Sequence, residues 1–226
     1  MSVVVVTGAG RGIGRAIAPA FAARGHDVAL LGRTTPELER TAAEVVTTGQ
    51  RALAIRCDVA RADEVERARD STLRELGTPN VVVNNAGIVR RAHVVAMKED
   101  DWDDVINVNL RGTFLVTRAF LPSMLEKKSG RCVALSSISG TLGGAKMSAY
   151  CASKWGIIGF VKALAEELRG SGLQAMCVMP GSVDTEMLRG SALEPEMTAE
   201  DVANVVLYAS LDAPSAMNGS AIEVFG

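Results

Sequence analysis

The sequence predicts an α/β fold: a doubly wound, seven-stranded parallel sheet with helices on both faces, forming a single domain over residues 1–226. Short apolar runs rich in β-branched residues alternate along the chain with longer segments of helical periodicity, and this alternation is typical of βαβ units. Most of the short runs are continuously apolar, as expected for strands that helices cover on both faces. No repeat, low-complexity segment or Pro/Ser-rich linker indicates a second domain.

Seven strands are expected, one at each of the short apolar runs. These runs are Val3–Val6, Asp27–Leu31, Ala52–Cys57, Asn80–Val83, Arg131–Leu135, Gln174–Val178 and Ala221–Val224. Because they read as buried strands along their whole length, the sheet is predicted to lie in the interior of the domain.

Six helices are expected between these strands, because the intervening segments repeat apolar residues at helical spacing. They are Gly14–Ala23, Pro36–Thr47, Ala62–Leu76, Glu99–Leu125, Ala149–Arg169 and Ala199–Leu211. Thr35 before Pro36, and Thr198 before an acidic first turn, are helix start signals. Gly49 and Gly170 are stop signals after the second and fifth helices.

Charge and cysteine content exclude several classes of protein. The 24 Lys and Arg residues against 26 Asp and Glu give a formal net charge of −2, so no overall basic field favours nucleic acid or anionic lipid. No uncharged apolar run approaches the roughly 20 residues of a membrane span, and the start of the chain lacks signal-peptide features. The four cysteines form no CxxC pair and no metal-ligand cluster, so we expect free thiols, no metal site and a cytoplasmic location.

A glycine-rich segment follows the first expected strand and leads directly into the first helix. It reads Thr7-Gly8-Ala9-Gly10-Arg11-Gly12-Ile13-Gly14. Bare backbone N–H groups and a helix N-terminus at such a junction favour a pyrophosphate, as in Rossmann folds. The spacing Gly8-x3-Gly12-x-Gly14 is one residue longer than GxGxxG. A tight strand-to-helix turn is the alternative, but the density of glycines favours a dinucleotide site.

The end of the second expected strand predicts that NADP(H) is preferred over NAD(H). An acidic residue at this position reads a free ribose 2′-hydroxyl, whereas a basic residue accommodates a 2′-phosphate. Here the strand ends in Gly32-Arg33 without a carboxylate, and Arg11 lies in the glycine-rich segment. Two guanidinium groups can hold a phosphate dianion through paired hydrogen bonds. The alternative is that both arginines are solvated surface residues.

Small and polar residues also follow the third and fourth expected strands, as Cys57-Asp58-Val59 and Asn84-Asn85-Ala86-Gly87. Ligands of open α/β sheets bind beyond the carboxyl ends of the strands, so these residues are in a suitable place. Taken singly, Asp58 is equally suited to cap the next helix, and the two asparagines to shape a turn.

Tyr150 and Lys154 are four residues apart on an expected helix and therefore share one face. A neighbouring ammonium favours the phenolate, so we expect Lys154 to lower the pKa of Tyr150 and suit the pair to acid/base catalysis. The alternative is an exposed surface pair. Ser137 follows the fifth strand, where its hydroxyl can stabilise charge on the same substrate oxygen. A serine hydrolase is excluded because the GxSxG elbow and a suitably placed histidine are missing.

Together these motifs make the sequence similar to a short, single-domain member of the classical short-chain dehydrogenase/reductase family. The resemblance spans nearly the whole chain and keeps the order and approximate spacing of the family's motifs. They are Thr7-Gly8-x3-Gly12-x-Gly14, Asn84-Asn85-Ala86-Gly87, Asn109 within Asn107-Val108-Asn109-Leu110, Ser137, Tyr150-x3-Lys154 and Pro180-Gly181-x-Val183-x-Thr185.

The resemblance implies a hydride transfer between a nicotinamide and a carbonyl or alcohol carbon. Tyr150 would deliver the proton, and Ser137 would polarise the carbonyl oxygen. Lys154 would hydrogen-bond the nicotinamide ribose, and Asn109 would hold a water that links Lys154 to solvent. The implied cofactor-binding residues are Gly8, Arg11, Gly12, Ile13, Gly14, Arg33, Asp58, Val59, Asn85, Ala86, Gly87, Tyr150, Lys154, Pro180, Gly181, Val183 and Thr185.

Two features depart from the family pattern. The chain ends in Glu223-Val224-Phe225-Gly226, where the family often has Asp-Gly-Gly, which affects only the C-terminal packing. The segment near 186–198, which would form the substrate lid, is short. An open pocket of this kind suits a bulky or carrier-tethered carbonyl, or leaves a small substrate less enclosed.

The resemblance includes reductases of 3-oxoacyl thioesters, which makes a carbonyl compound or acyl thioester the expected substrate. Arg90, Arg91 and His93 suit an acidic carrier protein or a coenzyme A phosphate, although a solvated loop is the alternative. The apolar helices around Trp102 and Trp155 predict a homo-oligomer, a dimer or a tetramer. Rival functions are a catalytically silent NADP sensor or scaffold, and an epimerase or dehydratase, for which a longer substrate domain would be needed.

Overall fold

The structure is a computed structural model that describes residues 2–189, 191 and 193–226. Its centre is one parallel sheet whose strands follow the chain as β1 (Ser2–Thr7), β2 (His26–Gly32), β3 (Ala52–Arg56), β4 (Val81–Asn84), β5 (Gly130–Leu135), β6 (Leu173–Pro180) and β7 (Ala221–Val224). The spatial order is β3-β2-β1-β4-β5-β6-β7, and every neighbouring pair is parallel. The chain therefore reverses its winding direction between β1 and β4, which confirms the predicted doubly wound sheet.

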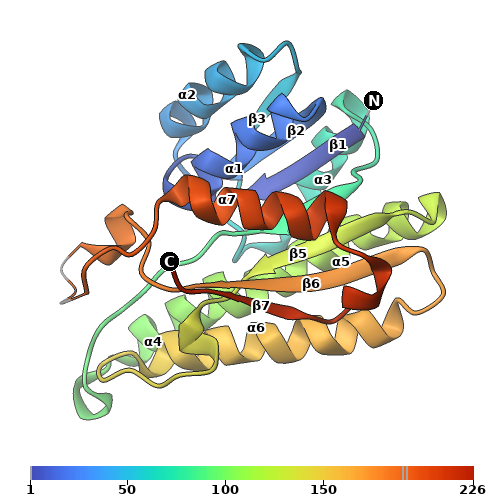
Figure 1. The fold of residues 1–226 in the computed structure, drawn as a ribbon. Helices are drawn as coiled ribbons and strands as arrows, with labels where there is room; N and C mark the ends of the chain where they lie inside the picture. The colour runs from blue at the N-terminus through green and yellow to red at the C-terminus, as the bar shows by residue number, and fades with distance from the viewer. Residues whose placement is uncertain (1, 190, 192) are drawn as a thin grey trace.

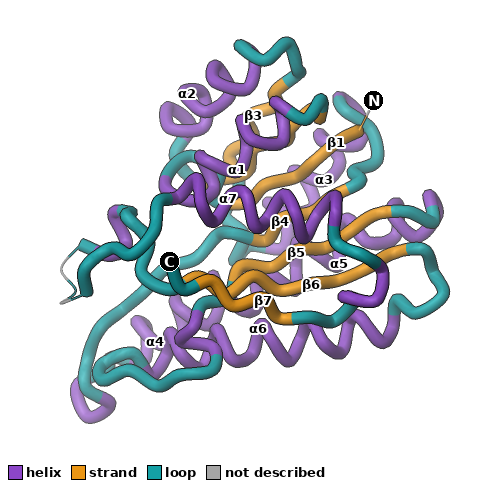
Figure 2. The backbone as a smooth tube through the Cα atoms, in the orientation of Figure 1, coloured by secondary structure: helices purple, strands orange, loops and turns teal. Residues whose placement is uncertain are grey.

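Helices cover both faces of this sheet (Figures 1 and 2). Helices α1 (Gly12–Ala23), α2 (Thr35–Val46) and α7 (Ala199–Leu207) pack on one face, and α3 (Ala62–Glu75), α5 (Gly112–Lys127) and α6 (Ser148–Glu167) pack on the other. The short helix α4 (Glu99–Val105) precedes α5 and packs near the start of α6. The three layers explain why the strands are apolar on both faces.

The central strands divide their side chains between two separate hydrophobic cores. Val4 and Val6 of β1 join the core under α1 and α7, whereas Val5 points to the core under α5 and α6. Phe21 anchors the first core and Phe120 the second, and both side chains are fully buried. Because successive residues of a strand face opposite sides, a continuous apolar run is what this arrangement requires.

The segment 99–125 differs from the single helix that its sequence pattern predicts. It is helical throughout, but Ile106–Arg111 forms a π-helical stretch between α4 and α5. The side chain of Asn109 in this stretch bonds to the backbone of Ile88, and Gly112 leaves space for Val59. These tertiary contacts account for the wider turn, since π-bulges are kept where a specific contact requires them.

The end of α7 shows a similar change. The predicted helix 199–211 continues beyond Leu207 as a second π-helical stretch, Tyr208–Asp212. The guanidinium of Arg131 donates to the carbonyl oxygens of Ala209 at 2.9 Å and Ala213 at 2.6 Å. A side chain from β5 thus satisfies backbone acceptors that a helix end leaves free. The remaining strand and helix ends differ from the predicted ones by a few residues.

Among the described residues, no helix is long and apolar enough to cross a membrane. The same residues contain no group of three or more His, Cys, Asp or Glu side chains placed to hold a metal ion. The four cysteines are free, and Cys57, Cys132 and Cys177 are buried.

Asp27 and Arg51 form an ion pair at the amino end of β2. The Asp27 carboxylate is buried and accepts from the backbone N–H of Arg51 at 2.8 Å and from its Nε and Nη2 at 3.0 and 2.8 Å. Burial alone would raise the pKa of Asp27, but the hydrogen bonds and charge of Arg51 lower it below its ordinary value. The ion pair therefore stabilises the fold at pH values at which Asp27 is ionised.

We expect Arg51→Met to lower the free energy of unfolding at pH 7 by about 1–3 kcal/mol, because it leaves a buried carboxylate without its partner. Because the pKa of Asp27 is lower in the folded state, the ion pair contributes its full stability at pH values above the unfolded pKa of about 4. This stability is lost as the pH falls through the pKa of Asp27 in the folded state. Urea unfolding between pH 7 and pH 3 should therefore show wild type and variant converging at acid pH. Arg74→Met, which breaks an exposed pair with Glu75, is the control and should cost about 0.5 kcal/mol or less. A difference independent of pH would contradict this account.

Candidate active site

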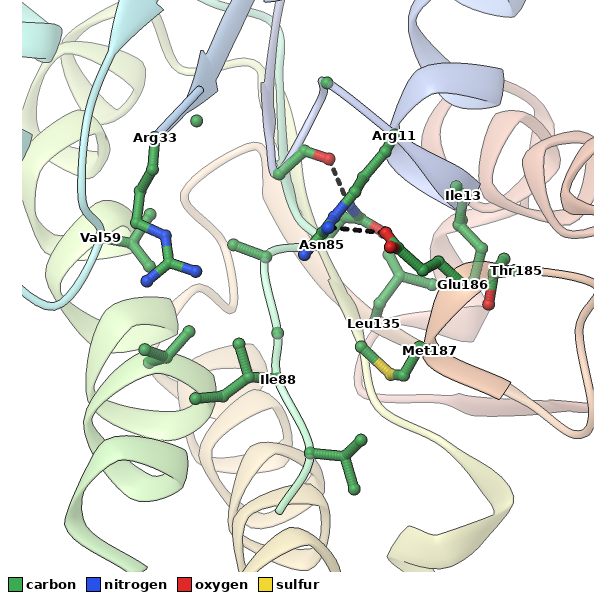
Figure 3. A pocket seen from close by; sticks show the side chains of 18 of the residues that line it. Arg11, Ile13, Arg33, Val59, Asn85, Ile88, Leu135, Thr185, Glu186 and Met187 are labelled. Carbon is green, nitrogen blue, oxygen red and sulfur yellow. Dashed lines mark hydrogen bonds and ion pairs between the residues drawn. The ribbon is translucent and has the colours of Figure 1, made fainter. Parts of the chain in front are cut away.

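A cavity of about 610 Å³ opens at the carboxyl ends of the strands, around the point where the winding reverses (Figure 3). Most of the predicted cofactor residues line it: Gly8, Arg11, Gly12, Ile13, Arg33, Asp58, Val59, Asn85, Ala86, Gly87, Tyr150, Lys154, Pro180 and Thr185. Gly14, Gly181 and Val183 lie outside the lining, and Val183 is buried and bridges to Met197. The predicted edge of the sheet is thus where the structure has its cavity.

The glycine-rich loop is fastened to the end of β4 by Thr7. Its buried hydroxyl accepts from the backbone N–H groups of Asn85 and Ala86 at 2.9 and 3.0 Å. In return, the Asn85 side chain donates to the carbonyl oxygens of Thr7 at 2.8 Å and Gly8 at 3.3 Å. A Cβ on Gly14 would collide with this same Gly8 oxygen, so a glycine is needed for the loop to lie so close to the helix.

The N-terminus of α1 faces the cavity without a side-chain cap. Arg11 precedes the helix and makes no capping hydrogen bond, and the first turn holds no acidic residue. Free N–H groups and the positive end of the helix dipole therefore point toward the space between Gly8 and Gly12. A Cβ on Gly12 would lie 3.3 Å from the Thr185 side chain, so a glycine here leaves the space between the loop and Thr185 unfilled. These features fit the pyrophosphate of a dinucleotide.

Arg33 and Arg11 lie on opposite sides of the cavity (Figure 3). Arg11 Nη1 is 2.7 Å from Glu186 Oε2 and forms an ion pair with it, although both side chains are well exposed. The two guanidinium groups are therefore not arranged as the joint phosphate clamp that the sequence suggested. Arg33 follows β2 directly and lines the cavity at the position where the sequence predicts contact with the adenosine ribose.

Tyr150, Lys154 and Ser137 come together at the other end of the cavity. Tyr150 and Lys154 are buried on one face of α6, with the Lys154 Nζ 5.5 Å from the centre of the Tyr150 ring. Ser137 follows β5, and its hydroxyl donates to the carbonyl oxygen of Pro180 at 3.3 Å. The neighbouring Ser136 hydroxyl donates to the carbonyl oxygen of Lys154 at 2.9 Å and so ties α6 to the end of β5. The predicted three side chains share one site.

The charge states in this site differ from the sequence-based expectation. Burial raises the pKa of Tyr150, while the Ser137 hydroxyl and the charge of Arg91 act in the opposite direction. Lys154 is not among the groups that lower the pKa of Tyr150, and its Nζ donates instead to the Leu135 carbonyl oxygen at 2.7 Å. Burial in turn lowers the pKa of Lys154 to about 8. The expectation of an acidified tyrosine is thus wrong for this state of the site.

Asn109 is fully buried and hydrogen-bonds to two segments next to the site, the loop at Ile88 and helix α6 at Ser153. Its Oδ1 accepts from the Ile88 N–H at 2.8 Å, and its Nδ2 donates to the Ile88 carbonyl oxygen and to Ser153 Oγ, both at 3.0 Å. Lys154 is a near neighbour, since a Cβ on Gly87 would lie 3.4 Å from Asn109 Oδ1 and 3.7 Å from Lys154 Nζ. Asn109 therefore joins the loop after β4 to α6.

The two ends of the segment predicted to form the lid lie next to each other. This segment contains the short helical turn Glu186–Leu188, and the N–H of Asp184 donates to the Met197 carbonyl oxygen at 2.9 Å. Glu186 and Met187 line the cavity. Residues 190 and 192 of the predicted lid lie outside the described residues.

Sequence reasoning missed three contributors to this site. Thr7 stands in the glycine motif but was not assigned a role, although its place just before the first glycine is a usable signal. The hydroxyl of Ser136 and the carboxylate of Glu186 gave no signal, because their partners, Lys154 and Arg11, are far away in the chain.

Comparisons with known proteins agree on one family. Residues 2–196 match the family model described as short chain dehydrogenase. The 3-oxoacyl-[acyl-carrier-protein] reductase of Synechocystis sp. is 37% identical over 235 residues, covering 99% of this chain and 95% of the relative. The 3-oxoacyl-[acyl-carrier-protein] reductase FabG of Escherichia coli is 32% identical over 240 residues, covering 99% and 96%.

Solved structures give the same result. A short-chain type dehydrogenase/reductase from Mycobacterium marinum superposes with a TM-score of 0.95 at 31% identity, covering 100% of this chain and 94% of that one. Levodione reductase superposes with a TM-score of 0.93 at 29% identity, covering 99% and 95%.

We expect Thr7→Val to weaken both the fold and nucleotide binding, because it leaves the N–H groups of Asn85 and Ala86 without their acceptor. The free energy of unfolding should fall by about 1–3 kcal/mol. The Kd for NADPH, measured by titration of its fluorescence, should rise about tenfold, which corresponds to about 1.4 kcal/mol. Thr7→Ser keeps the hydroxyl and should behave as wild type. Equal losses in both variants would show that the hydroxyl group is not what carries the effect.

Proposed function

The chain belongs to the short-chain dehydrogenase family and is an oxidoreductase, and we propose that it transfers a hydride between NADP(H) and a ketone or secondary alcohol. The observation that carries this proposal is that Tyr150 and Lys154 line one end of a cavity whose other end is the glycine-rich loop, with the Ser137 hydroxyl next to Tyr150. A 3-oxoacyl thioester is the favoured substrate class, supported by the names of the relatives in Synechocystis and E. coli.

Bound NADPH supplies the hydride, and the protein supplies the proton and the geometry. The Tyr150 hydroxyl donates a proton to the carbonyl oxygen as it becomes an alkoxide. Because burial raises the pKa of Tyr150, the phenol is in the protonated form that this step needs at neutral pH. The Ser137 hydroxyl is a second donor to the same oxygen.

Lys154 has two roles in this proposal. Its ammonium stabilises the phenolate that Tyr150 becomes after proton transfer, and it hydrogen-bonds the nicotinamide ribose when it leaves the Leu135 carbonyl oxygen. A pKa of about 8 keeps most of Lys154 charged at neutral pH while allowing it to pass on a proton. Asn109 holds the adjacent loop and the proposed water-linked route to solvent.

NADP(H) is proposed as the preferred cofactor on the strength of Arg33. It lines the cavity beside Val59 and Asp58, at the end of the strand that reads the ribose. A guanidinium provides paired donors for a 2′-phosphate, and β2 ends without a carboxylate that would repel it. Arg11 contributes only after it separates from Glu186.

We also propose self-association through the outer surface of α4, α5 and α6. Trp102, Phe114 and Trp155 of these helices are 39%, 41% and 54% exposed, and large aromatic side chains in such numbers favour a covered face. A second copy of the chain in a dimer or tetramer is the proposed occupant. The free cysteines are consistent with the cytoplasmic location expected from sequence.

We expect Tyr150→Phe to reduce turnover of acetoacetyl thioesters with NADPH by about 10²- to 10⁴-fold, because it removes the proton donor. NADPH binding, followed by fluorescence, should stay unchanged. Tyr208→Phe is the matched control, since Tyr208 is the other tyrosine of the chain and contacts Met217 at the surface. Full activity in Tyr150→Phe would refute the proposed role. NADPH binding by wild type without reduction of any ketone would favour the silent sensor.

We expect Arg33→Asp to raise the KM for NADPH about tenfold to a hundredfold through loss of charge-assisted hydrogen bonds, and to leave the KM for NADH nearly unchanged. Arg40→Asp makes the same charge change on the exposed surface of α2 and controls for the general field. An unaltered ratio of kcat/KM for NADPH and NADH in Arg33→Asp would overturn the assignment.

A further inference from the structure

Two consecutive arginines, Arg90 and Arg91, lie in the loop after β4 and are partnered very differently. Arg90 lines the cavity, whereas Arg91 lies beside it and is hydrogen-bonded to the lining residue Met187. Arg90 pairs with two carboxylates of α4, with Nε 3.2 Å from Asp101 and Nη2 3.6 Å from Asp104. Arg91 occurs in none of the ion pairs that the described residues form, and it donates instead to the neutral carbonyl oxygen of Met187 at 3.3 Å. The charge of Arg91 is therefore not balanced by a carboxylate of the described residues.

Arg91 is also held in place from two sides. The next residue, Ala92, donates its N–H to the Lys146 carbonyl oxygen at 3.1 Å, and Lys146 adopts a left-handed backbone with φ of 64°. A non-glycine residue in this conformation is strained, and such strain is typical of functional loops. The other anchor, Met187, lies at the wall of the cavity (Figure 3). Arg91 thus bridges the rim between the loop after β4 and the lid.

The position of Arg91 couples it to Tyr150. Burial raises the pKa of Tyr150, and the positive charge of Arg91 acts against that increase. An anion placed on Arg91 would cancel this opposing effect and keep the phenol protonated, which is the form that donates a proton to a carbonyl. Arg91 therefore lies close enough to the proposed proton donor to hold an anionic group of the same substrate.

We propose that Arg91 binds an anionic oxygen group of the carbonyl substrate, a carboxylate or a phosphate, and so restricts the enzyme to ketones that carry a negative charge. This inference rests on the proposed function and narrows its substrate class. A guanidinium has five N–H donors in a planar fork, and only one of them is used on the Met187 carbonyl. The others suit a carboxylate or phosphate through paired hydrogen bonds. Arg90, already neutralised by Asp101 and Asp104, has no such role.

The test compares matched substrates in wild type, Arg91→Gln, Arg91→Lys and Arg90→Gln. Acetoacetate and its ethyl ester differ in the carboxylate, whereas acetoacetyl coenzyme A and acetoacetyl N-acetylcysteamine differ in the phosphates. We expect Arg91→Gln to lower kcat/KM for the charged member of one pair by about tenfold to a hundredfold, mainly through KM. Its neutral partner should change by less than about threefold, and Arg91→Lys should retain part of the activity. Arg90→Gln removes the same charge at a lining residue that Asp101 and Asp104 already neutralise, so it should change the charged and neutral members of each pair alike.

The pair that responds identifies the anion, a carboxylate for acetoacetate and a phosphate for the coenzyme A thioester. Equal losses on charged and neutral substrates, or equal effects of Arg90→Gln and Arg91→Gln, would overturn the inference.

A binding measurement separates this inference from the proposed function. Acetoacetate and coenzyme A are titrated into the NADPH complex of each variant, and the change in NADPH fluorescence is followed without need for turnover. Binding that is weakened by Arg91→Gln and not by Arg90→Gln supports the anion site. It does so even if the wild type reduces none of the four substrates, because that failure would refute only the proposed reaction. Binding that is absent in wild type, or unaffected by Arg91→Gln, refutes the anion site.

Discussion

The site depends on the neighbouring carboxyl ends of β1 and β4, and the hydrogen bonds of Thr7 hold these two ends together. These two strands are adjacent in the sheet, but the chain turns away from them toward opposite faces. A crevice follows at their carboxyl ends, because the connections leave in different directions. The Thr7 hydroxyl and the Asn85 side chain bind the two loops to each other across this crevice. The glycine-rich loop, the open end of α1 and the loop that carries Arg91 are all positioned from this junction.

The end of the cavity that holds Tyr150 and Lys154 is positioned by a second junction, between β5 and α6. Ser136 fastens the backbone of Lys154 to the end of β5, and Ser137 follows immediately. Tyr150 lies one helical turn before Lys154 and is buried against Val105 and Ala149. Burial has opposite effects on the two groups, since it raises the pKa of a phenol and lowers that of an ammonium. The same burial therefore keeps Tyr150 protonated and lowers the pKa of Lys154 to about 8, close to neutral pH.

The order of strands and helices and the grouping of Tyr150, Ser137 and Lys154 followed from the sequence, because apolar periodicity and helical spacing are local properties. The π-helical stretch at Asn109 did not, since it depends on a contact with Ile88 in another loop. The direction of the pKa shift of Tyr150 was also mispredicted. Spacing shows that Lys154 shares a face with Tyr150, but it cannot show that the ammonium is bound to Leu135 or how deeply the phenol is buried. Likewise, the pairing of Arg11 with Glu186 joins residues at opposite ends of the chain.

Local pairing, rather than net charge, decides which ligands this cavity favours. The formal net charge of −2 excludes a broad basic surface but says nothing about individual cations. Arg11 and Arg90 are matched by Glu186, Asp101 and Asp104, whereas Arg33 and Arg91 occur in none of the ion pairs among the described residues. Arg33 lines the cavity directly after β2, and Arg91 lies near Tyr150, the proposed proton donor. A slightly acidic protein thus leaves two arginines of this region without a carboxylate partner among the described residues, Arg33 in the cavity lining and Arg91 hydrogen-bonded to the lining residue Met187.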